Sequence, residues 1–331
     1  MGVSMQALVF DGPADDTSAT RVATVDRPTP GPGQVAIAVD YAGINFKDVM
    51  ARRGDPGYAD TWPYVAGLEV AGEIVALGPG VDTVRPGQKV AALTNAGGLA
   101  DVAIADSTLV TPLPPGLDPA VAAIAPGALT TAELLVRDVA RVRAGDVVAV
   151  HSASGAVGAA IAPLARLAGD ITLIGIVGSA ARAQAALKAG YDSAHLRGPG
   201  LADSVRETAP TGVNVVFDPQ GTESLESDLA ILGPTGRIVL FGNAGGGSLG
   251  PLPATGRLYG GNAAIGGFSL AALSATDPAR VRDAMARVFD HLATARLVVR
   301  PIVLDGLAGA PEAQQRLATG TGEGKYVVRV R

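Results

Sequence analysis

The sequence predicts an α/β protein in which a doubly wound parallel sheet is joined to a second, β-rich domain. Three observations predict this class. The chain has 331 residues, more than one ordinary hydrophobic core requires. Its first third consists of short alternating apolar runs that are rich in Gly, Pro and Val. Its middle alternates strand patterns with helix patterns, which is typical of a parallel sheet covered by helices.

The N-terminal region carries a β pattern from residue 5 to about residue 110. The Pro-Gly-Pro-Gly turn at residues 30–33 precedes an apolar run at residues 34–39, which predicts a strand. Two further runs, Glu69–Leu77 and Gln88–Leu93, continue the all-β pattern.

The period of the apolar residues becomes helical near residue 119, and Ala120–Ala125 and Thr130–Val139 are predicted helices. A last amphipathic helix at Ala279–Ala295 precedes two short strands, and Gly245-Gly246-Gly247 predicts a flexible loop. Between these, predicted strands and helices alternate at residues 147–151, 157–168, 171–177, 179–189, 201–209, 213–218, 223–232 and 236–241.

One strand-turn-helix segment has the pattern of a phosphate-binding turn. The apolar run Val147–His151 ends in Ala153-Ser154-Gly155-Ala156-Val157-Gly158, where a dinucleotide-binding fingerprint would have G-x-G-x-x-G. Small residues let backbone N–H groups at a helix N-terminus approach a pyrophosphate, whose negative charge the helix dipole favours. Because one glycine is replaced, the motif alone is equally compatible with a buried helix rich in Ala and Gly.

The end of the second predicted strand favours NADPH over NADH. NAD-binding proteins usually place a carboxylate there to hold the ribose 2′-hydroxyl, whereas NADP-binding proteins place Arg nearby. Here the strand ends in Gly178 and Ser179, followed by Arg182, and Arg197 follows the third strand. The planar donor group of Arg suits a phosphate dianion. The alternative is that both arginines are solvated surface charges.

The composition argues against several classes of function. The chain is 48% apolar and 17% charged, as in globular proteins, and its net charge of −5 includes no basic stripe for nucleic acid. No apolar run reaches the roughly 18 residues of a membrane helix, and we see no signal peptide, so we expect a cytoplasmic protein without a membrane partner. The absence of Cys and the scatter of the three His predict no metal site.

Several motifs in order along the chain resemble the medium-chain dehydrogenase/reductase superfamily. The resemblance implies a chaperonin-10-like β-rich catalytic domain at residues 1–122, completed by 270–331, and a Rossmann NADPH-binding domain at residues 123–269. The motifs that carry it are Gly33-Gln34-Val35, Gly43 to Asp48, Gly67 to Gly72, Gly87 to Val90, Leu129-Thr130-Thr131, the turn at 153–158, Phe241-Gly242-Asn243 and Gly324-Lys325.

Two departures from the family pattern select a branch without zinc. Zinc alcohol dehydrogenases have Cys where this chain has Asn45 and His where it has Leu68, and neither Asn nor Leu replaces those ligands on zinc. The chain therefore resembles the zinc-free quinone oxidoreductases. It is also similar to the enoyl reductases of polyketide synthases, whose Asn-Phe-Arg-Asp is close to Asn45-Phe46-Lys47-Asp48.

The resemblance assigns cofactor roles to particular residues. It implies that Asn45 lies near the nicotinamide ribose and that Thr130 faces the carboxamide, whereas the family's tyrosine near the 2′-phosphate is replaced by Leu196. Together with the residues of the turns above, the candidates for cofactor binding are Asn45, Thr130, Ser154, Gly155, Ala156, Val157, Gly178, Ser179, Arg182, Arg197, Phe241, Gly242, Asn243, Phe268 and Lys325. Asp218, at the end of the fourth strand, predicts either a ligand contact or a helix N-cap.

Without a Lewis acid, hydride transfer to a simple ketone is disfavoured, whereas a conjugated acceptor spreads the developing charge. We therefore expect NADPH-dependent reduction of a quinone or an α,β-unsaturated carbonyl compound. The alternatives are reduction of an enoyl thioester in a polyketide or other secondary-metabolite pathway and, third, NADPH binding without catalysis. The catalytic candidates are Asn45, Lys47, Asp48, Tyr58, Tyr64 and Thr130.

Four of these candidates, and His151, also have a structural interpretation. Lys47 and Asp48 could form an ion pair, Tyr58 and Tyr64 could pack within a loop, and His151 at the end of its strand is more typical of a structural residue. The apolar sixth-strand candidate, Asn262–Leu270, suits edge pairing between Rossmann sheets, so we expect a homodimer.

Overall fold

The computed structural model describes residues 3–246 and 248–331. The chain forms two compact units. The terminal unit contains the chain up to Thr130 together with Leu270–Arg331, and the parallel-sheet unit contains Thr131–Ser269. The domain boundary that we predicted from the sequence follows residue 122, slightly before the division between these units. The third glycine of the predicted 245–247 loop lies outside the described residues.

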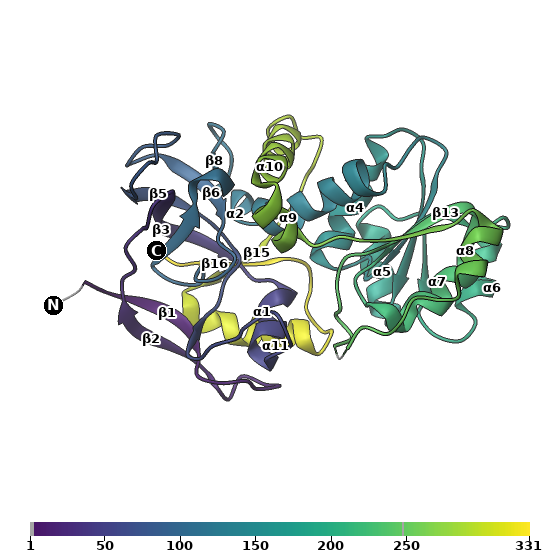
Figure 1. Ribbon diagram of the computed structural model, residues 1–331, viewed down its shortest axis with the longest axis horizontal. Coiled ribbons are helices and arrows are strands. Elements are labelled where there is room, and N and C mark those ends of the chain that lie inside the picture. Colours follow the sequence, from purple (N-terminus) through teal and green to yellow (C-terminus); the bar gives the residue numbers. More distant parts are fainter. Residues whose placement is uncertain (1–2, 247) are drawn as a thin grey trace. The chain divides into compact units, whose positions relative to one another are not determined.

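The terminal unit is built on an antiparallel-rich sheet in the order β15-β16-β3-β5-β6-β8, with β7 paired to β3, and on a smaller sheet in the order β2-β1-β4. The C-terminal strand β16 lies against β3, so the yellow end of the chain returns to the purple N-terminal strands (Figure 1). Its strands are β1 (Ser4–Phe10), β2 (Thr20–Asp26), β3 (Gln34–Gly43), β4 (Tyr64–Val65), β5 (Glu69–Leu77), β6 (Lys89–Leu93), β7 (Val102–Asp106), β8 (Val110–Pro112), β15 (Ile302–Asp305) and β16 (Tyr326–Arg329).

The terminal unit also contains helices, of which α10 is the longest. Helix α10 is amphipathic, and it buries Val281, Met285 and Phe289 while its other face stays in solvent. The helices of the terminal unit are α1 (Phe46–Arg53), η1 (Ser107–Leu109), α2 (Pro119–Ala122), η2 (Ala125–Leu129), α9 (Leu270–Thr276), α10 (Pro278–Ala293), η5 (Leu307–Gly309) and α11 (Ala310–Ala318).

The parallel-sheet unit confirms the predicted fold class. Its sheet has the order β11-β10-β9-β12-β13-β14, every neighbouring pair is parallel, and the strand order reverses between β9 and β12. In such sheets, ligands bind beyond the carboxyl ends of the strands near that reversal. The strands are β9 (Val147–His151), β10 (Thr172–Val177), β11 (Ser193–Leu196), β12 (Val213–Asp218), β13 (Leu232–Leu240) and β14 (Ala264–Gly267).

Apolar side chains of the strands and helices form the core of the parallel-sheet unit, with Ile174, Ile176, Val216 and Ile238 at its centre. The sixth strand is shorter than predicted, because only Ala264–Gly267 pair with β13. The helices are α3 (Thr130–Glu133, which starts at the last residue of the terminal unit), η3 (Leu134–Val139), α4 (Ala156–Arg166), α5 (Ala180–Lys188), α6 (Leu201–Thr208), η4 (Thr222–Ser224), α7 (Leu225–Ile231) and α8 (Thr255–Gly261). No helix of the described residues is long and apolar enough to cross a membrane.

Candidate functional site

The turn between β9 and α4 presents the N-terminus of an 11-residue helix. Gly155 is the N-cap and has no side chain to cap the helix, so N–H groups of the first turn are left for a ligand as far as the described residues show. A Cβ at Gly158 would lie 2.5 Å from the carbonyl oxygen of Ser152, so only glycine lets α4 start this close to the strand. Ser154, Gly155, Ala156 and Val157 are partly exposed, and Ala156 occupies the first helical position. The turn therefore has the features that a pyrophosphate requires.

The next candidates follow the carboxyl end of β10, the strand beside β9, and so lie on the same side of the sheet as the turn. A Cβ at Gly178 would meet nothing within 4 Å, and Ser179 is the N-cap of α5, where its hydroxyl accepts a hydrogen bond from the Arg182 N–H at 3.4 Å. Arg197 follows β11 on the same edge, and its backbone N–H donates to the Val177 carbonyl. Arg197 is exposed; desolvation by the neighbouring protein lowers its pKa, and the carboxylates of Asp218 and Asp228 oppose that shift.

The remaining Rossmann candidates lie at the carboxyl ends of β13 and β14. The Phe241 N–H donates to the Asp218 carbonyl at 2.8 Å, and the Phe268 N–H donates to the Leu240 carbonyl at 2.8 Å. A Cβ at Gly242 would lie 2.8 Å from the Pro219 carbonyl oxygen, and Asn243 follows it in the same turn. Since all six strands are parallel, their carboxyl ends lie on one side of the sheet. These residues are therefore on the same side as Ser154–Val157 and Gly178–Arg182.

A buried polar cluster lies beneath the carboxyl ends of β9 and β12 in the parallel-sheet unit. The His151 Nε2 lies 2.7 Å from Asp228 Oδ1, and both side chains are fully buried. Asp218 accepts hydrogen bonds from the Gln220 N–H at 2.6 Å and from the Ser224 hydroxyl at 2.5 Å. Burial raises the pKa of Asp218 to about 6, and the neighbouring Asp228 adds to the shift. These contacts tie His151 to the protein's own groups, as its structural interpretation predicts, while His151 Nδ1 and Asp228 Oδ2 are buried without a hydrogen-bond partner among the described residues.

In the terminal unit, the sheet register brings three polar residues together. Two of them, Asn45 and Lys325, were predicted, and the third, Glu69, was not. Gly43 at the end of β3 pairs with Glu69 of β5 on one side and with Val327 of β16 on the other. Asn45 follows that end of β3, and Lys325 directly precedes β16. The register therefore places Asn45, Glu69 and Lys325 side by side.

These three side chains form the network that we call the Glu69 network. Lys325 Nζ lies 2.6 Å from Glu69 Oε1 and donates to Asn45 Oδ1 at 2.6 Å. Asn45 Nδ2 donates to Glu69 Oε1 at 2.9 Å, and the Gly127 N–H donates to Glu69 Oε2 at 2.6 Å. The Lys325 side chain is 8% exposed and the Glu69 side chain 0%. Asn45 remains partly exposed, so it is the member of the network that a ligand can reach.

Sequence reasoning missed Glu69, although it stands in a quoted motif, Gly67-Leu68-Glu69. The available signal was an acid inside an otherwise apolar run, at the start of a predicted strand. A buried acid requires a partner, but the partner Lys325 lies near the other end of the chain, and no spacing rule points to it.

Asp48 and Lys47 do not pair with each other as the ion-pair alternative proposed. Asp48 Oδ2 accepts the Asn45 N–H at 2.8 Å at the start of α1, and Oδ1 accepts the Gly67 N–H at 3.1 Å. Burial raises the pKa of Asp48 to about 6. Lys47 donates to the Asn95 carbonyl at 3.3 Å, and its pKa is lowered by burial. Asp48 thus fixes the backbone that carries Asn45.

The two tyrosines and Thr130 also have defined surroundings in the terminal unit. The Tyr64 ring is stacked on Phe10 with 6.1 Å between centroids, and burial raises its pKa to about 12. Tyr58 packs against the same hydrophobic core, and burial raises its pKa as well. The Thr130 hydroxyl donates to the Ala125 carbonyl at 2.8 Å and is buried.

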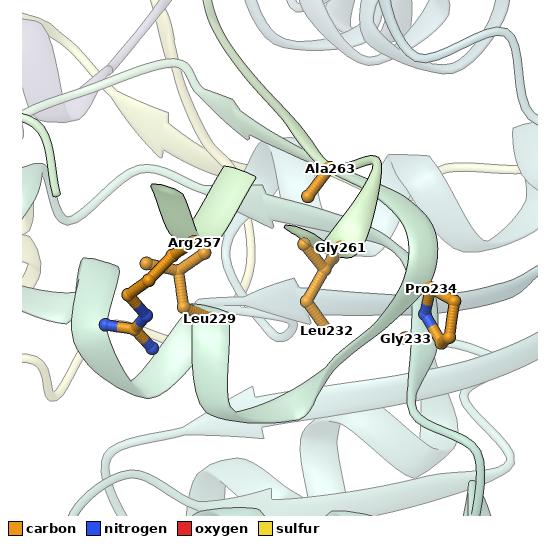
Figure 2. A pocket seen from close by; sticks show the side chains of 7 residues that line it. All are labelled: Leu229, Leu232, Gly233, Pro234, Arg257, Gly261 and Ala263. Carbon is orange, nitrogen blue, oxygen red and sulfur yellow. The ribbon is translucent and has the colours of Figure 1, made fainter. Parts of the chain in front are cut away.

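A pocket of about 230 Å³ lies elsewhere in the parallel-sheet unit (Figure 2). Leu232, Gly233 and Pro234 line it at the start of β13, which is the edge of the sheet opposite to the carboxyl ends. Arg257 of α8 also lines it and is paired with Glu226. The predicted site residues are therefore not part of this pocket.

The residues of this chain do not fit a catalytic zinc ion. Asn45 and Leu68 stand at the positions where the resemblance stated above implies zinc ligands, and an amide and an aliphatic side chain are not zinc ligands. Among the residues that the structure describes, no group of three or more His, Cys, Asp or Glu side chains could hold a metal ion.

Comparison with known proteins connects both units to one superfamily. A family described as alcohol dehydrogenase GroES-like domain matches residues 31–115, and one described as zinc-binding dehydrogenase matches residues 156–289. The mycocerosic acid synthase-like polyketide synthase of Mycolicibacterium smegmatis is 32% identical over 98% of this chain and 15% of its own length. The chain thus spans about 15% of the length of this curated relative.

Two solved structures are similar over almost the whole chain. Mycobacterial Rv1454c complexed with NADPH has a TM-score of 0.88 at 29% identity, covering 98% of this chain and 99% of that chain. A mycobacterial quinone oxidoreductase has a TM-score of 0.85 at 29% identity, with the same coverage. Together with the ordered motifs, the parallel sheet and the β-rich unit, these similarities show that the chain belongs to the medium-chain dehydrogenase/reductase superfamily of oxidoreductases.

Proposed function

We propose that this chain uses NADPH to reduce a quinone or a conjugated enone. The observation that carries the proposal is the set of residues at the carboxyl ends of the parallel strands. There the uncapped N-terminus of α4 lies next to a β10 end that offers Gly178, Ser179 and Arg182 rather than a carboxylate. Helix N–H groups suit a pyrophosphate, and the lack of an acid together with an Arg suits a 2′-phosphate.

Each part of the cofactor has residues in this chain that fit it. Ser154–Val157 would hold the pyrophosphate, and Ser179, Arg182 and Arg197 would hold the 2′-phosphate. Phe241, Gly242, Asn243 and Phe268 would line the cofactor beyond their strands. The family that the sequence resembles implies Asn45, Thr130 and Lys325 for the nicotinamide end; of these, Asn45 is partly exposed and would make the contact, whereas Thr130 and Lys325 are buried and would support it. The solved relative that contains NADPH supports the choice of this cofactor.

The bound cofactor supplies a hydride, and the chain supplies position and a dry environment. A conjugated acceptor suits this chain, because the charge that develops on its oxygen is delocalised and needs no Lewis acid. Tyr64, whose pKa is raised to about 12, keeps its proton at neutral pH and can donate a hydrogen bond. The solved quinone oxidoreductase that resembles the chain supports this substrate class.

A second candidate function is reduction of an enoyl thioester. The similarity of nearly the whole chain to one segment of a polyketide synthase favours it. The two functions share the cofactor and the hydride transfer but differ in the acceptor, which is a free planar molecule in one case and a carrier-bound acyl chain in the other.

The deciding experiment follows the oxidation of NADPH, and separately of NADH, with a planar o-quinone, a simple enone and crotonyl thioester. Turnover of the quinone or enone with NADPH, and little turnover of the thioester, supports the first function. Turnover of the thioester alone supports the second. Faster turnover with NADH contradicts the assignment of Ser179, Arg182 and Arg197 to a 2′-phosphate.

We also propose that the protein forms a homodimer through β14. This strand is at the edge of its sheet and is paired on one side to β13, so its other side offers free N–H and C=O groups. Ile265→Pro removes one of the donors in this strand. Light scattering should show a dimer for the wild type and a smaller mass for the variant, whereas a monomeric wild type contradicts the proposal.

A further inference from the structure

We propose that Glu69 is a positioning residue for the nicotinamide end of NADPH, acting through the amide of Asn45. The inference rests on the proposed function, because it takes Asn45 as a group that contacts the cofactor. It adds a residue, Glu69, that touches no cofactor itself and that determines which way the Asn45 amide points.

Opposite charges on the two sides of Asn45 fix the orientation of its amide. The amide nitrogen donates to the Glu69 carboxylate at 2.9 Å, and the amide oxygen accepts from the Lys325 ammonium at 2.6 Å. A flipped amide would place its NH₂ against the ammonium and its oxygen against the carboxylate, and both contacts would be repulsive. The partly exposed amide is therefore held in one orientation before any ligand arrives.

The backbone around Glu69 leaves space for its carboxylate and donates a hydrogen bond to it. A Cβ at Gly43 would lie 2.4 Å from Glu69 Oε1, and a Cβ at Gly127 would lie 2.7 Å from Oε2. The Gly127 N–H also donates to Oε2 at 2.6 Å. Two glycines thus leave room for a carboxylate that receives three donors, and these donors determine its position.

A glutamine at position 69 has the same shape but cannot satisfy this network. It offers one acceptor oxygen where the structure has three donors, which come from Asn45, Lys325 and Gly127. In either orientation the substitution removes the negative charge that attracts the Lys325 ammonium and sets an NH₂ against a donor of the network. Glu69→Gln therefore weakens the hold on the Asn45 amide and leaves the turn between β9 and α4, in the other unit, unchanged.

The test compares binding of NADPH with binding of adenosine 2′,5′-bisphosphate, which lacks the nicotinamide half. Glu69→Gln should weaken NADPH binding about tenfold, the worth of one charge-assisted hydrogen bond, and change the fragment's Kd less than about twofold. Glu73→Gln is the matched control, because Glu73 lies on the same strand in a partly exposed ion pair with Lys89. It should change neither Kd.

A double-variant cycle with Asn45→Ala separates positioning from a general structural role. If Glu69 acts through Asn45, Glu69→Gln adds no further loss of NADPH affinity in the Asn45→Ala background. Equal losses in both backgrounds, or equal losses for NADPH and the fragment, overturn the inference. If Glu69→Gln does not fold, Glu69→Asp takes its place in the same cycle, because it keeps the charge and withdraws the carboxylate from Asn45 by one methylene; an additive loss overturns the inference there too.

These binding measurements are independent of the reaction. A wild type that binds NADPH and shows the non-additive cycle, but reduces none of the acceptors, upholds the inference and overturns the proposed reaction. A wild type that binds no NADPH overturns both.

Discussion

The two units each bury a polar network at the end of their strands, and the networks balance charge in opposite ways. In the Glu69 network, one carboxylate meets one ammonium and two neutral donors. In the cluster next to the candidate phosphate-binding turn, the carboxylates of Asp218 and Asp228 share His151 and the nearby Arg197. The first network pairs one carboxylate with one ammonium, whereas the second sets two buried carboxylates close enough that Asp228 raises the pKa of Asp218.

This difference predicts different responses to mutation and to pH. A matched buried pair is intolerant of losing one partner, because the other is left charged and unpaired. An acid-rich cluster instead relieves itself by taking up a proton, and the pKa of Asp218 is accordingly raised to about 6. We therefore expect the Glu69 network to respond mainly to mutation and the Asp218 cluster to respond to pH.

The largest expected effect is the loss of one partner of the Glu69 network. Lys325→Met leaves the fully buried Glu69 carboxylate without its cation, so we expect the free energy of unfolding to fall by about 3–5 kcal/mol. Urea unfolding followed by circular dichroism measures the change.

Lys89→Met is the matched control for this substitution. Lys89 pairs with Asp40 and Glu73, but its side chain is 51% exposed, so we expect a loss of at most about 1 kcal/mol. Equal losses for the two variants would show that burial does not distinguish the Glu69 network from a surface ion pair.

The second prediction concerns pH. The folded pKa of Asp218, about 6, lies above the model-peptide value of 3.8, so the folded state holds the proton more tightly than the unfolded state. The resulting stabilisation is complete below about pH 4 and is lost as the pH rises through 6. A difference of about two pKa units corresponds to about 3 kcal/mol.

Asp218→Asn should therefore flatten the pH dependence of stability between pH 4 and pH 7. Asp48, whose pKa is also raised to about 6, contributes a decline of the same sign in the wild type and keeps it in the variant. The measurement is the unfolding free energy of both proteins across this range. An unchanged slope in Asp218→Asn would mean that Asp218 is ionised throughout and that the cluster does not titrate.

The sequence predicted the parallel-sheet unit more completely than the terminal unit for a physical reason. In a parallel sheet, the carboxyl ends of the strands lie on one edge, so residues after each strand, such as Ser154, Ser179 and Phe241, could be grouped from the chain order alone. The expected strand Asn262–Leu270 was too long, because apolar residues continue beyond Gly267, the last residue of β14 that pairs with β13.

The Glu69 network could be predicted only in part. Asn45 and Lys325 were named from a family resemblance, but their contact depends on the pairing of β16 with β3 and of β3 with β5. Those pairings set side by side residues from both ends of the chain, and no local pattern encodes them. Glu69, which connects the two, is visible only once the register is known.

The smallest predicted effect tests whether space or charge holds Glu69 in place. Gly127→Ala would put a Cβ 2.7 Å from Glu69 Oε2, so either the carboxylate or η2 must shift. Overpacking of this kind should reduce the unfolding free energy by about 1–3 kcal/mol. Gly12→Ala, where a Cβ meets nothing within 4 Å, should change it by less than about 0.5 kcal/mol. If Gly127→Ala were as stable as Gly12→Ala, the carboxylate would have room to move, and its charge partners rather than the two glycines would set its position.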